Sequence, residues 1–65
     1  MEHEKLIKEF YTAHENLNAA RWGGTMEEAA EYEAELEALR ARNYNGWQEA
    51  ERIALDRYNE FLRSL

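Results

Sequence analysis

The 65 residues make one small domain, and 14 acidic against 8 basic side chains give a net charge of −6 that argues against nucleic-acid and membrane-surface binding. Without cysteine there is neither a disulfide nor a cysteine-bound zinc site. No apolar run approaches the roughly 20 residues of a membrane span and no signal segment follows the charged start, so we expect a soluble protein, cytoplasmic if expressed as it stands, with its compartment otherwise unassigned.

The first predicted helix spans residues 2–22. Its apolar residues recur every three or four positions, which places them on one face of an α-helix and predicts its share of the core. The residues of this row are Leu6, Phe10, Ala13, Leu17 and Ala20. The helix is predicted to end at GGT, residues 23–25, with Gly23 in the left-handed conformation that often closes a helix.

The second predicted helix spans residues 26–42, in the stretch TMEEAAEYEAELEALRAR. Thr25 and Glu28 form the T-x-x-E pattern of a capping box at its start. Glutamates come first, and Arg40 and Arg42 come last, as the helix dipole favours. Residues 25–45 carry six Glu and two Arg, a net charge of −4. The core row of this helix is predicted to be Ala29, Tyr32, Leu36 and Leu39.

The third predicted helix spans residues 46–64. Asn43 is expected to close the second helix in a left-handed conformation, and Asn45 with Gln48 is expected to cap the third. Its apolar row is Trp47, Ala50, Ala54, Tyr58, Phe61 and Leu65. Two short connections force neighbouring helices to run antiparallel, so the sequence predicts an all-α, up-down-up antiparallel three-helix bundle over residues 1–65.

Residues suited to catalysis or metal binding are few. Ser64 is the only serine and stands at the end of the last helix. His3 and His14 are three turns apart, too far to share a metal ion. Carboxylate pairs such as Glu27 and Glu31 lie on a polar face that gives no reason for a raised pKa. We therefore expect no enzyme, no catalytic residue, no metal site and no cofactor.

A second row on the first helix mixes aromatic, charged and amide side chains. It comprises Ile7, Tyr11, His14, Asn18, Arg21 and Trp22. Such mixtures are typical of interface centres, whereas a plain solvent face gains nothing from Ile7 or Trp22. Because the second helix follows every local preference and the first breaks several on one face, we interpret this row as a binding face. The alternative is that the row widens the core and that Trp22 covers the end of the bundle.

The third helix offers a companion row, Gln48, Arg52, Leu55, Asn59 and Leu62. If both rows face the same way, they form a two-helix surface, although bundle handedness is left open by the sequence. The predicted partner-binding residues are Ile7, Tyr11, His14, Asn18, Arg21, Trp22, Arg52, Leu55, Asn59 and Leu62. The expected partner is a target protein, with the chain favoured as a monomer over a homodimer.

In style the whole chain resembles a de novo designed three-helix mini-protein binder. The likeness lies in its length, its short capped connections, its lack of Cys and Pro, and the regular stretch TMEEAAEYEAELEALRAR; the connection NYNG and the two Asn of the first helix depart from it. The resemblance implies docking of a rigid helix face that can block a target protein.

Two alternatives stay open. One is a natural small acidic inhibitor of the kind phages encode, acting on a host enzyme or a defence complex. In its nucleic-acid-mimicking form this inhibitor would use the second-helix carboxylates Glu27, Glu28, Glu31 and Glu35. The other is a homodimerising structural bundle, closed through the mixed row of the first helix.

Overall fold

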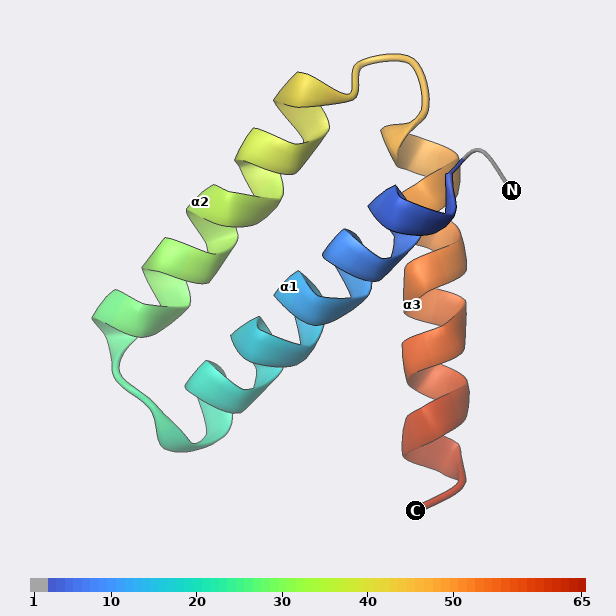
Figure 1. The fold of residues 1–65 in the computed structure, drawn as a ribbon. Coiled ribbons are helices and arrows are strands. Elements are labelled where there is room, and N and C mark those ends of the chain that lie inside the picture. Colours follow the sequence, from blue (N-terminus) through green and yellow to red (C-terminus); the bar gives the residue numbers. More distant parts are fainter. Residues whose placement is uncertain (1–2) are drawn as a thin grey trace.

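The computed structural model describes residues 3–65, and in that range the chain is all-α with three helices and no strand (Figure 1). They are α1 (Glu4–Gly23), α2 (Met26–Arg42) and α3 (Trp47–Arg63). The bounds of α2 are those predicted. His3 precedes α1, residue 2 of the predicted first helix lies outside the described residues, and α3 is one residue shorter at each end than predicted.

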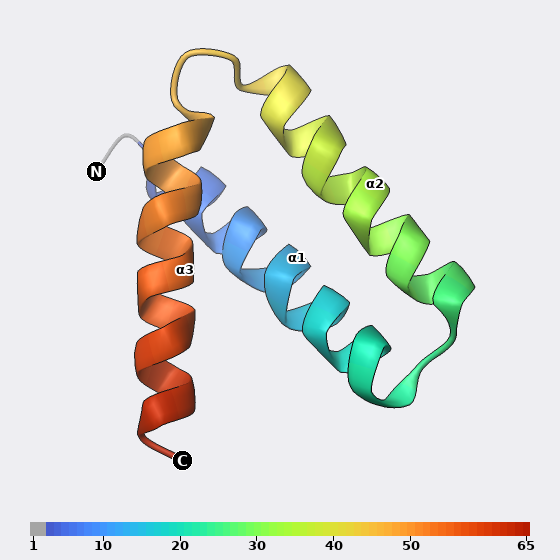
Figure 2. The ribbon, with the colours of Figure 1, turned by 180° about the vertical axis from the view of Figure 1, so that it is seen from behind.

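Helix α1 lies in the middle and packs against both neighbours, whereas α2 and α3 approach each other only beside the loop that joins them (Figures 1 and 2). Helices α1 and α3 cross near their N-terminal ends and diverge toward their C-terminal ends (Figure 1). The chain measures 33 × 29 × 14 Å. The three-helix bundle is therefore a thin, splayed layer, and α1 needs apolar residues on both sides.

The core follows most of the predicted rows. Its buried apolar residues are Ile7, Phe10, Ala13, Leu17, Ala20, Leu36, Leu39, Ala50, Ala54 and Tyr58. Ile7 is buried, whereas the expected core residue Leu6 is only partly buried. Because α1 faces two helices, its buried side is wider than the single predicted row. The predicted core positions Phe61 and Leu65 are wrong: their side chains are 45% and 86% exposed, since α3 has left α1 at that point.

The first connection confirms one predicted cap and corrects another. Thr25 Oγ1 accepts a hydrogen bond from the backbone N–H of Glu28 at 3.1 Å, as predicted. Gly23 is the last residue of α1, and no residue in 3–65 has a positive φ, so the left-handed prediction is wrong. The glycine that matters is Gly24, where a Cβ would lie 3.0 Å from the Cα and the carbonyl oxygen of Ala20.

The second connection uses a different cap from the one predicted. The Asn43 side-chain amide donates to the Leu39 carbonyl oxygen at 2.8 Å, satisfying one of the free carbonyls at the end of α2. Its φ of −123° is not left-handed. Gly46 precedes α3 and no side chain caps that helix, so the predicted Asn45–Gln48 cap is wrong.

Candidate functional site

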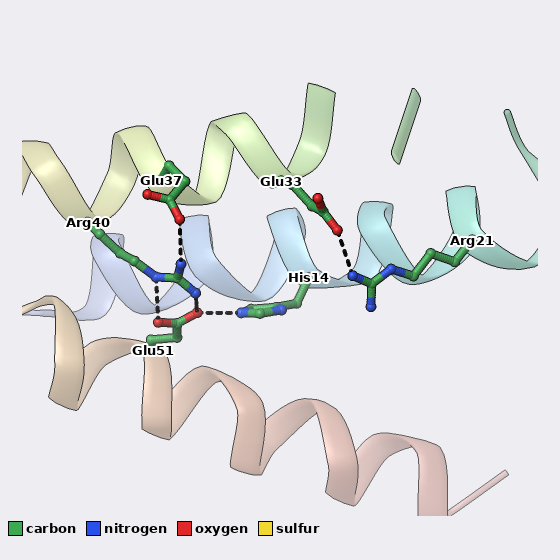
Figure 3. A network of polar contacts seen from close by, with 6 residues as sticks. All are labelled: His14, Arg21, Glu33, Glu37, Arg40 and Glu51. Atoms are coloured by element: carbon green, nitrogen blue, oxygen red, sulfur yellow. Dashed lines mark hydrogen bonds and ion pairs between the residues drawn. The ribbon is translucent and has the colours of Figure 1, made fainter. Parts of the chain in front are cut away.

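A buried carboxylate joins all three helices (Figure 3). Glu51 of α3 is 7% exposed and accepts two hydrogen bonds from Arg40 of α2, Nε to Oε1 at 3.0 Å and Nη2 to Oε2 at 2.7 Å. His14 of α1 places Nε2 at 2.7 Å from the same Oε2. The Arg40 guanidinium also lies 5.5 Å from the centre of the Trp47 ring and 3.4 Å from Glu37. This cluster is the polar connection between the otherwise separate α2 and α3.

The surroundings of Glu51 keep it ionised. Burial raises the pKa of this carboxyl, but the hydrogen bonds from Arg40 and His14 and the nearby Arg40 charge together lower it more, to below its ordinary value of 4.5. The hydrogen bond to Glu51 in turn raises the pKa of Arg40. With both oxygens engaged, the carboxylate holds three helices in register.

Acid is expected to destabilise the fold from about pH 4.5 downward. Because the pKa of Glu51 is lower in the folded than in the unfolded chain, the unfolded chain binds the proton first as the pH falls. The stability that this carboxylate contributes is present above that pH. On acidification it decreases progressively, until the carboxyl of the folded chain is also protonated. Urea midpoints at about pH 6 and about pH 3 should differ more for the wild type than for Glu51→Gln. An equal decrease of the urea midpoint in both proteins would show that Glu51 does not cause the loss of stability in acid.

The mixed row of α1 faces α3 over most of its length. Ile7 has no exposed surface, so its assignment to a binding face is wrong. The Tyr11 and Tyr58 rings meet edge to face with centres 5.5 Å apart, and the Asn18 amide donates to the Tyr58 hydroxyl at 3.0 Å. His14 is held by Glu51. The alternative prediction, that this row widens the core, therefore holds for its first four residues. Their polar groups can lie in the α1–α3 contact because they have hydrogen-bond partners on α3.

The last two residues of that row are exposed. Arg21 pairs with Glu33 of α2 at 2.7 Å, and both side chains are more than half exposed (Figure 3). Trp22 is 85% exposed. The prediction that Trp22 covers the bundle end is thus wrong, and it is the one large apolar residue of the row left at the surface.

The companion row lies on the outer side of α3. Arg52 and Asn59 are exposed, Leu62 is 42% exposed and Leu55 is partly buried. A shallow hollow of about 430 Å³ runs along this side of α3, lined by Trp47, Gln48, Glu51, Arg52, Leu55, Asp56 and Asn59. Because the α1 row points into the α1–α3 contact, the two rows do not form the predicted continuous two-helix surface.

Large apolar residues lie exposed at the C-terminal ends of α1 and α3. Phe61 and Leu65 were predicted to be core residues, whereas Trp22 was predicted to lie on the binding face of the first helix. Phe61 and Leu65 follow Tyr58 by three and seven residues and so continue the α3 row that faces α1. Trp22 follows Asn18 by four residues and continues the opposing α1 row. The helices diverge there (Figure 1), and these side chains are 45–86% exposed. We call Trp22, Phe61, Leu62 and Leu65 the fork face. Helical periodicity alone cannot predict the fork face, because the exposure of these residues depends on how α3 crosses α1.

Among residues 3–65 no group of three or more His, Asp or Glu side chains is close enough to hold a metal ion. None of the three described helices is both long and apolar enough to cross a membrane. No protein-family model, curated protein or solved structure matches the chain.

Proposed function

We propose that the chain is a non-catalytic protein-binding module that docks through the fork face. The observation that carries this proposal is the exposure of four large apolar side chains at the C-terminal ends of α1 and α3. Isolated apolar residues are normal on a protein surface, but Phe61, Leu62 and Leu65 lie within five residues of one another at the end of α3. Together with Trp22 at the end of α1, they are of the types that anchor binding sites.

The proposed site keeps part of the predicted residue set and replaces the rest. Five of its members remain: Trp22 and Leu62 in the fork face, and Arg52, Leu55 and Asn59, which extend the face along α3. The short, capped connections and the Glu51 cluster hold α1 and α3 in a fixed relation, so docking would need little rearrangement. Docking by a preformed surface agrees with the resemblance to designed mini-protein binders. The designed origin itself stays a prediction from the style of the sequence.

Site-specific photo-crosslinking tests this proposal. A photoreactive apolar residue at position 62, in the fork face, is compared with the same residue at Ala38, an exposed position on α2. We expect covalent protein adducts from position 62 and none from position 38. Unlabelled wild-type chain should suppress the adducts, and Phe61→Asp should abolish them, because a charge in the apolar centre of a contact is costly. Equal labelling from both positions, or no competition by unlabelled chain, would overturn the proposed function.

A further inference from the structure

Basic side chains without an ion pair gather in one hollow of this acidic chain. Of the 8 bases, those that pair with an acid among residues 3–65 are Arg21, Arg40, Arg52 and Arg57. Three of the other four line a hollow of about 470 Å³, whose walls come only from α1 and α2. These three are Lys5, Lys8 and Arg42, and the fourth is Arg63 in the last turn of α3. We call this space the α1–α2 hollow.

The α1–α2 hollow lies on the far side of these two helices from the Glu51 cluster. At about 100° per residue, Lys5 lies on the opposite side of α1 from His14, and Arg42 on the opposite side of α2 from Arg40. Helices α1 and α2 run antiparallel (Figure 1), so the beginning of α1 lies beside the end of α2. The three bases therefore share one end of the hollow, and their side chains are exposed.

Two carboxylates line the same hollow without neutralising these bases. Within the described chain, neither Glu9 nor Glu35 makes an ion pair. Glu9 follows Lys5 by four residues, which is the weaker order for an ion pair along a helix. Glu35 precedes Arg42 by seven residues, about 10 Å along α2, and so lies toward the other end of the hollow. The basic end is thus left with positive charge that an outside anion can meet.

We propose that the α1–α2 hollow binds a small phosphate-bearing molecule, with at least two negative charges, through Lys5, Lys8 and Arg42. Arginine can engage two phosphate oxygens at once, and lysine adds a compact charge beside them. The bases are exposed and the chain as a whole is acidic, so binding is weak. We expect a dissociation constant on the order of 1 mM at low salt. This site is separate from the fork face and does not depend on the proposed function.

Backbone amide NMR of the full chain, titrated with pyrophosphate at an ionic strength held constant with sodium chloride, measures this binding. We expect saturable shifts concentrated near the beginning of α1 and the end of α2. Lys8→Gln and Arg42→Gln should each raise the dissociation constant about two- to fivefold, as expected for loss of one exposed ion pair. Arg63→Gln is the matched control, because it changes the net charge equally outside the hollow, and it should leave the constant unchanged.

Glu9→Gln tests the same hollow in the opposite direction. Removing this negative charge should lower the dissociation constant about two- to fivefold, since the carboxylate repels the bound anion. Glu60→Gln, at an exposed position of α3, makes the same change in net charge and should have no effect.

Three results would overturn the phosphate site. The first is the absence of saturable shifts up to about 20 mM pyrophosphate. The second is an equal effect of Arg42→Gln and Arg63→Gln, which would mean that the anion responds only to the net charge of the chain. The third is an equal response to acetate, whose single charge does not match three bases.

Discussion

Phe10→Ala is expected to remove a large part of the stability of the fold. Phe10 has no exposed surface and lies on α1, the helix against which both others pack. Truncating a buried Phe to Ala costs about 3–5 kcal/mol, and a domain of this size has about 3–10 kcal/mol of stability in total. Far-ultraviolet circular dichroism with urea titration would show the lost helicity and the lowered midpoint.

Trp22→Ala is the matched control for this prediction. It removes a large aromatic side chain from the same helix, but one that is 85% exposed. Its free energy of unfolding should stay within about 0.5 kcal/mol of the wild type. Equal losses in the two variants, or a wild-type midpoint for Phe10→Ala, would contradict the packing of α1 described above.

Glu51→Ala is expected to destabilise the fold by about 2–3 kcal/mol, because it leaves two hydrogen-bonding partners without an acceptor. The side chains of Arg40 and His14 are 32% and 17% exposed, so water compensates for only part of the loss. Because of this partial exposure, we expect a smaller cost than for breaking a fully buried pair. The variant also loses the polar contact between α2 and α3. Urea unfolding at neutral pH measures the effect.

Glu37→Ala tests whether this cost belongs to the buried position of Glu51. Glu37 also contacts Arg40, at 3.4 Å, but its side chain is 77% exposed. Its removal should change the free energy of unfolding by less than about 0.5 kcal/mol, as for other surface ion pairs. Similar losses for Glu37→Ala and Glu51→Ala would mean that the burial of Glu51 does not set the cost.

Local features of the sequence predicted the helices well. The bounds of α2 and the Thr25 cap depend on residues within a few positions of one another, so propensity and capping patterns suffice. The same holds for the buried row Phe10, Ala13 and Leu17, which depends only on the helical period.

Features that depend on distant residues were missed. The irregular row of α1 was visible in the sequence, but its meaning was not, because His14 and Asn18 are satisfied by residues 37 and 40 positions away. Interface residues and interhelical hydrogen-bonding residues are of the same types. Likewise, Phe61 and Leu65 keep the core period but lie beyond the point where α3 leaves α1.

A splayed layer with α1 in the middle has two open edges, as an unclosed β-sheet has. Because α2 and α3 barely touch, a helix laid along the outer side of either would extend the layer without disturbing a contact already made. A closed three-helix bundle offers no such place, since each of its helices already has two neighbours. Growth by addition of helices is thus built into the arrangement, as it is in stacked helical repeats.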